Sequence, residues 1–105
     1  MIFITSCRDD SFTARDLTIT PEEATAGESI LLEFQLENRW DQEIKSIWTL
    51  VINGEIVQSK EIRAAAEATT RGYFRTTAGE PGEYTVAIRD AVSEKLTGTF
   101  RVTAP

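Results

Sequence analysis

Carboxylates and hydroxyls are the groups left for chemistry in this chain, which has no histidine and a single cysteine, Cys7. Without histidine, imidazole-based acid–base catalysis and most zinc sites are excluded. One cysteine cannot form an internal disulfide or a cysteine-rich metal site. No pairing of nucleophile and base, phosphate-binding loop or metal cluster can be assembled from the remaining residues. We therefore expect a protein that is not an enzyme and holds no cofactor.

Two acidic segments are the candidates for a cation site. Asp41 and Glu43 lie in one predicted loop, and Asp90 and Glu94 lie in another. Carboxylate oxygens suit Ca²⁺ if the two loops meet. The spacing does not match a calcium-binding loop, so we favour solvated surface charge and keep calcium as the alternative.

A second candidate site is the loop that contains Arg39, Trp40 and Asp41. Tryptophan and arginine are enriched at interaction hot spots, so this loop is a candidate for binding a partner protein, a sugar ring or another part of a cell-surface polymer. A carbohydrate-binding module is a less favoured alternative. The alternative is that Trp40 folds over the end of the domain and caps the core, which is the interpretation we favour because large aromatic side chains are usually mostly buried.

The segment before residue 12 differs from the rest of the chain. Ile4–Cys7 resembles a bacterial lipobox, which would imply lipidation of Cys7 and a membrane tether at that residue. Only six residues precede Cys7, whereas a signal peptide needs an apolar region of about 7 to 15 residues. Residues 1–11 are therefore an N-terminal tail, either the remnant of a lipoprotein signal or an accidental match to one.

Composition places the remainder, residues 12–105, in one domain. Hydrophobic residues make up 41% of the chain, and no apolar run approaches the roughly 20 residues that span a bilayer. The net charge of -6 repels phosphate backbones and anionic lipids. We expect no nucleic-acid partner and no membrane contact beyond a lipid anchor at Cys7.

The elements that would position these residues are β-strands. Apolar and polar residues alternate in short runs separated by turn signals at a spacing of about 8 to 12 residues. Asn53-Gly54 between two such runs predicts a tight hairpin, because both residues tolerate positive φ. Residues 22–28 and 64–68 are predicted to be loops. About seven strands are expected, which fits an all-β, immunoglobulin-like antiparallel β-sandwich.

Particular residues support this fold. Trp48 is expected to anchor the core, and Tyr84 is expected to form a tyrosine corner through its hydroxyl group. Ile47 and Val51 make the opposite face of their strand unusually apolar, which suggests that a neighbouring element or a partner covers them. The charged strand at residues 55–63 should resist pairing with another chain, whereas the strand at 12–20 is the better edge for strand addition.

The order of these segments resembles the CARDB domain, the cell-adhesion-related domain found in bacteria, along residues 12–104. The segments that carry the resemblance are Leu17–Pro21, Gly27-Glu28, Phe34–Asn38, Leu50–Gly54, Phe74, Gly82–Val86 and Phe100–Val102. The resemblance implies an immunoglobulin-like sandwich of secreted and cell-surface proteins with no catalytic motif. We therefore expect a non-catalytic adhesion or structural interaction module, extracellular or in the cell envelope. The alternative is a binding subunit, an inhibitor or accessory protein, that acts by strand addition or through its loops.

Overall fold

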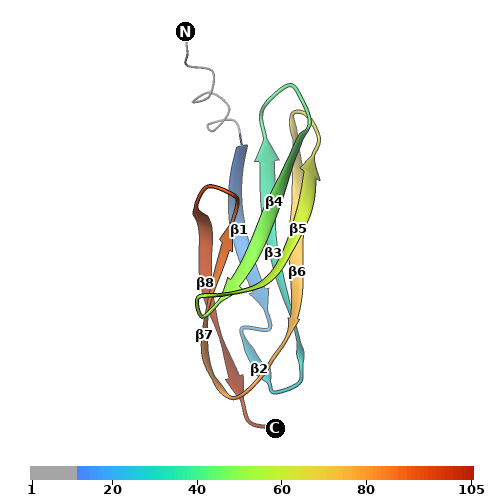
Figure 1. Ribbon diagram of the computed structural model, residues 1–105. Helices are drawn as coiled ribbons and strands as arrows, with labels where there is room; N and C mark the ends of the chain where they lie inside the picture. The colour runs from blue at the N-terminus through green and yellow to red at the C-terminus, as the bar shows by residue number, and fades with distance from the viewer. Residues whose placement is uncertain (1–11) are drawn as a thin grey trace.

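The computed structural model describes residues 12–105 as an all-β molecule (Figure 1). No helix in this part of the chain is long and apolar enough to cross a membrane. The strands are β1 (Phe12–Thr20), β2 (Glu23–Thr25), β3 (Ser29–Asn38), β4 (Ile44–Ile52), β5 (Glu55–Ala64), β6 (Ala68–Thr77), β7 (Gly82–Arg89) and β8 (Glu94–Thr103).

The strands form two packed sheets. One sheet has the order β1-β3-β6, and the other has the order β2-β8-β7-β4-β5. All neighbouring strands are antiparallel except β2, which runs parallel to β8. β1 lies beside β8 along one side of the sandwich, and β5 lies beside β6 along the other. The predicted all-β sandwich is confirmed, with eight strands in residues 12–105 where about seven were expected.

The one strand that the sequence did not indicate is β2. Residues 22–28 were expected to form only a turn, but Glu23–Thr25 pair with Arg101–Thr103 of β8. Ala24 is 1% exposed and points into the core. Three residues are too few to show an alternating pattern, and their pairing partner lies far away in the chain, so local sequence carries little sign of this strand.

The core follows the alternation expected for β3. Ile30, Leu32, Phe34 and Leu36 are fully buried. Trp48 is 1% exposed, and its ring centroid lies 5.7 Å from that of Phe34, which confirms its expected place in the core. The aromatic cluster therefore ties β3 to β4 across the two sheets.

The predicted hairpin between β4 and β5 is also present. Asn53 has a φ of 52° and Gly54 a φ of 83°, as a two-residue turn of this kind requires. The Asn53 Oδ1 atom accepts a hydrogen bond from the Thr85 amide at 2.9 Å, and the Asn53 amide donates to the Thr85 carbonyl at 2.9 Å. The turn is therefore fixed to β7 as well as to its own strands.

Tyr84 forms the expected tyrosine corner at the start of β7. Its hydroxyl group donates a hydrogen bond of 2.5 Å to the Glu80 carbonyl. Its ring stacks on Phe100 with a centroid distance of 5.0 Å. These contacts fix the turn that joins β6 to β7 onto β8.

Candidate functional site

The loops at the end of the sandwich where β3 meets β4 are organised by Asn38. Its side chain is 1% exposed and is the one buried polar side chain in the described part of the chain. The two hydrogens of Nδ2 are shared among three carbonyl oxygens, those of Gln42 at 2.9 Å, Ala64 at 3.1 Å and Ala65 at 3.1 Å. The amide group therefore holds the loop after β3 against the loop after β5.

Trp40 sits on this braced loop. Its amide donates to the Asn38 Oδ1 atom at 3.0 Å, and its carbonyl accepts from the Glu67 amide at 2.9 Å. Glu67 has a φ of 54°, which turns the chain so that its amide faces Trp40. Hydrogen bonds thus hold the backbone of Trp40 at both its amide and its carbonyl.

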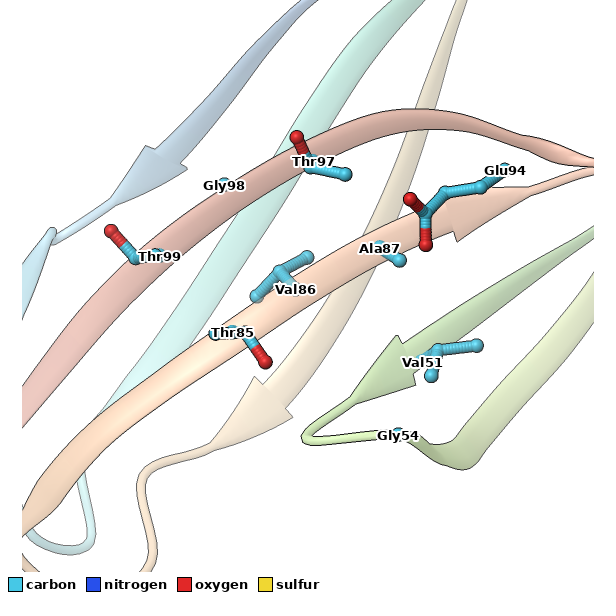
Figure 2. A pocket seen from close by; sticks show the side chains of 9 residues that line it. All are labelled: Val51, Gly54, Thr85, Val86, Ala87, Glu94, Thr97, Gly98 and Thr99. Atoms are coloured by element: carbon cyan, nitrogen blue, oxygen red, sulfur yellow. The ribbon is translucent and has the colours of Figure 1, made fainter.

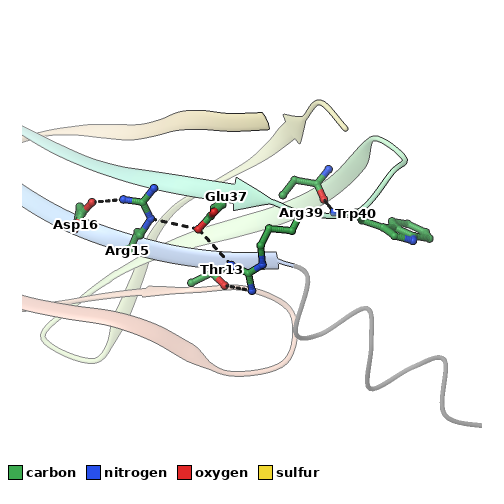
Figure 3. Close-up of polar contacts among 7 residues, drawn as sticks. Thr13, Arg15, Asp16, Glu37, Arg39 and Trp40 are labelled. Carbon is green, nitrogen blue, oxygen red and sulfur yellow. Dashed lines mark hydrogen bonds and ion pairs between the residues drawn. The ribbon is translucent and has the colours of Figure 1, made fainter. Parts of the chain in front are cut away.

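The indole ring of Trp40 is half-buried and lies at the end of the molecule (Figure 3). It is not among the partly buried apolar residues that pack against the core cluster in residues 12–105. A half-buried ring can contact neighbouring loops and still present apolar surface to a partner. Both of the roles expected for Trp40, cap and contact residue, are compatible with this position.

Arg39 points away from the indole ring, back along β3 (Figure 3). Its Nη1 atom lies 3.3 Å from Glu37 Oε1, and its Nη2 atom donates to Thr13 Oγ1 at 3.4 Å. Arg15 approaches the same Glu37 oxygen at 3.6 Å. The structure therefore places Arg39 in a surface ion-pair cluster on the three-stranded sheet, while Asp41 is exposed on the loop beside Trp40.

The two acidic segments considered for calcium, Asp41 with Glu43 and Asp90 with Glu94, lie at different positions along the long axis of the sandwich. The last pair between β4 and β7, Thr49 with Arg89, lies five residues from Ile44, or about 16 Å along the strand. The connection that begins at Asp90 therefore starts well short of the loop that precedes Ile44. Asp90 Oδ1 accepts from the amides of Val92 and Ser93 at 2.8 and 2.9 Å. No group of three or more metal-ligating side chains occurs in residues 12–105.

The outer face of the five-stranded sheet carries a shallow hollow of about 450 Å³ (Figure 2). Its lining combines small apolar side chains, threonines and one carboxylate, and consists of Val51, Gly54, Thr85, Val86, Ala87, Glu94, Thr97, Gly98 and Thr99. The expectation that Ile47 is covered is not met within residues 12–105, because its side chain is 51% exposed on this face. Val51 is partly covered at the edge of the hollow.

Asn38, the residue that shapes the candidate site, was not predicted from the sequence. Its position continues the inward series of Phe34 and Leu36, and a polar residue at the inward end of an alternating strand is the signal that was available. Cys7 and the rest of the 1–11 tail lie outside the described residues.

Comparison with known proteins supports the fold. No family model matches the chain, and no curated protein matches it in sequence. Among solved structures, it is similar to the alkylpurine DNA glycosylase AlkC of Pseudomonas fluorescens, bound to DNA with an abasic-site analogue, at 19% identity and a TM-score of 0.76. That match covers 90% of this chain and 31% of AlkC.

Two β-glucosidases are similar in the same way. EmGH1 of Erythrobacter marinus matches at 11% identity and a TM-score of 0.76, over 89% of this chain and 15% of the enzyme. The β-glucosidase of Listeria innocua in complex with glucose matches at 17% identity and a TM-score of 0.73, over 87% and 16% of the two chains. This chain therefore corresponds to less than a third of each of these proteins, and identities this low show a shared fold alone.

Proposed function

We propose that this chain is a non-catalytic interaction and spacer module of a protein in the extracellular space or the cell envelope, of the CARDB type. The matched part of each similar structure is a minor portion of a longer chain, which is the pattern of a domain used as a module. The family assignment rests on the order of the sequence segments around Leu17–Pro21, Leu50–Gly54 and Gly82–Val86.

The shape of the domain suits a spacer. Its principal extents are 57 × 22 × 18 Å. Phe12, where β1 begins, pairs with Asn38 at one end of the sandwich, and Thr103, where β8 ends, pairs with Thr25 at the other (Figure 1). A chain that enters at one end and leaves at the other separates its neighbours by the length of the rod.

The observation that carries the interaction role is the half-buried Trp40 at the end of this rod, whose backbone is held by hydrogen bonds. Asn38 and Glu67 hold its backbone, so little backbone conformational entropy is lost when a partner contacts the ring. A flat indole surface beside the exposed Asp41 carboxylate suits a protein surface or a cell-surface polymer that offers apolar faces and donor groups.

Cosedimentation with purified peptidoglycan sacculi tests this role. Wild type is expected to bind, and Trp40→Ala is expected to bind about tenfold more weakly while its free energy of unfolding changes by less than about 0.5 kcal/mol. Val92→Ala is the matched control, because Val92 is an exposed apolar residue, 83% accessible, on a different loop.

Two results would contradict the proposal. Wild type that stays in the supernatant would remove the polymer as a partner. A loss of about 3 kcal/mol of stability in Trp40→Ala with binding retained would show that the ring caps the core instead.

A further inference from the structure

The two long sides of the sandwich are closed in different ways, and the side formed by β1 and β8 leaves part of a strand edge uncovered. On the opposite side, β5 supplies side chains that bond to the backbone of β6. Lys60 Nζ donates to the Tyr73 carbonyl, and Gln58 Nε2 donates to the Arg75 carbonyl. These bonds occupy two of the outward carbonyls of β6, and the charges of Glu61 and Arg63 further discourage pairing on that side.

The edge of β8 is covered over only part of its length. β2 pairs with Arg101–Thr103 and with no earlier residue of β8. The Arg101 amide donates to the Glu22 carbonyl at 2.9 Å, so the backbone groups of Arg101 face this edge. Since alternate residues of a strand face the same way, the amides and carbonyls of Thr97 and Thr99 also face it. Within residues 12–105 no strand pairs with them there.

Beside this uncovered stretch lies a hollow of about 370 Å³ between β1 and β8. It is lined by Leu17, Thr18, Ile19, Glu22, Thr97, Gly98 and Thr99. A Cβ atom on Gly98 would stand 3.0 Å from Ile19 Cδ1 and 3.3 Å from Leu17 Cδ2, so a larger residue would crowd these side chains. The glycine keeps an apolar floor, formed by Leu17 and Ile19, next to the free backbone edge.

The edge of β1, which the sequence favoured for strand addition, is less suitable. Its register with β3 shifts between Arg15 and Thr18, where Asp16 has a φ of 59°. A bulge of this kind twists an edge and interrupts the regular spacing of its hydrogen-bonding groups. The uncovered part of β8 from Leu96 to Thr99 keeps an unbroken register with β7, opposite Thr85–Ile88, and the register shifts only beyond Leu96, at Lys95.

The charges around the β8 edge indicate that the partner carries basic residues. The two cations of this strand are paired, Lys95 with Asp90 at 3.9 Å and Arg101 with Glu83 at 3.1 Å. Glu22 and Glu94 stand exposed near the two ends of the uncovered stretch, about 20 Å apart along the strand, and neither takes part in an ion pair within residues 12–105. Two free carboxylates at this spacing complement basic residues at the ends of an extended segment.

We propose that β8 binds a partner by strand addition along Leu96–Thr99. The partner is an extended peptide segment with small or β-branched residues at its centre and Lys or Arg at each end. Its backbone bonds to the free groups of Thr97 and Thr99, its central side chains cover the floor formed by Leu17 and Ile19, and its basic ends face Glu22 and Glu94. This surface is separate from the Trp40 end, so the proposal stands or falls independently of the proposed function.

A synthetic heptapeptide, KVTVTVK, tests the proposal in NMR titrations with the full chain. Binding is expected to slow hydrogen exchange of the Thr97 and Thr99 amides specifically. Thr97→Pro removes the outward donor while leaving the β7 side of the strand untouched, and it is expected to weaken binding by about tenfold. Thr97→Val, which keeps the amide, is the matched control and is expected to bind like wild type.

Modified peptides keep the test decisive even if Thr97→Pro fails to fold. The same peptide methylated on every central amide cannot pair as a strand and is expected not to bind, and EVTVTVE is expected to bind more weakly than KVTVTVK. Equal binding of the methylated peptide, no protection at Thr97 and Thr99, or no binding of KVTVTVK at millimolar concentration would each overturn the proposal.

Discussion

At the scale of single residues, Asn38 is a buried polar side chain that stabilises the structure because its hydrogen-bonding groups all have partners. Its side-chain nitrogen donates to the carbonyls of Gln42, Ala64 and Ala65, and its side-chain oxygen accepts from the Trp40 amide. We predict that Asn38→Ala lowers the free energy of unfolding by about 3 kcal/mol, because it leaves buried backbone groups of both loops without partners. Urea unfolding followed by tryptophan fluorescence measures the change.

Gln42→Ala is the control for this prediction. Gln42 belongs to the same loop, is exposed, and contributes its carbonyl, which alanine retains. It is expected to stay within about 0.5 kcal/mol of wild type. If Asn38→Ala were as stable as Gln42→Ala, the amide would not be what holds the two loops together.

At the scale of elements, the β4–β5 hairpin depends on backbone geometry at its turn. Gly54 has a φ of 83° and open space around the position of a Cβ atom, so substitution there strains the backbone without causing a clash. We predict that Gly54→Ala lowers the free energy of unfolding by about 1 to 2 kcal/mol in urea unfolding. Gly79→Ala is the matched control, because a Cβ atom at Gly79 meets only Tyr84 Oη, at 3.7 Å. Equal stability of the two variants would contradict a turn that requires positive φ.

Elements with strong local signals could be predicted from the sequence. The alternation of Ile30 to Leu36 gave the inward face of β3, and Asn53-Gly54 gave the hairpin, because both depend on residues that are neighbours in the chain. β2 could not be predicted in this way, since its pairing with Arg101–Thr103 is set by the packing of the whole molecule.

The candidate sites were harder to predict than the fold. The sequence predicted Trp40 on a loop. Only the structure shows that the Arg39 side chain points away from the indole ring and contacts Glu37 and Thr13. The uncovered edge of β8 could not be predicted from the sequence, because it depends on where the short strand β2 ends. Loop geometry and edge coverage are tertiary properties, and the alternation of residues within a strand does not encode them.

At the scale of the whole molecule, the resemblance in fold to AlkC raises the question of DNA binding, and the charges argue against it. The chain carries a net charge of -6. On the outer face of the three-stranded sheet, Arg71 Nε lies 2.5 Å from Glu33 Oε2, and Arg15 is paired with Asp16 at 2.6 Å. Arginines already paired with carboxylates contribute little to binding a phosphate backbone. Such binding depends on unpaired basic groups that neutralise phosphates and so release the counterions condensed on the nucleic acid.

We therefore predict no binding to a duplex that contains an abasic-site analogue, measured by fluorescence anisotropy at low salt, where electrostatic attraction is strongest. Asp16→Asn combined with Glu33→Gln and Glu37→Gln removes the carboxylates that pair with Arg15 and Arg71 and serves as the sensitised variant. A weak salt-dependent signal in this variant alone would show that the carboxylates suppress phosphate binding. Binding by wild type that weakens steeply as salt rises would contradict the prediction and would place nucleic acid among the partners of this sandwich.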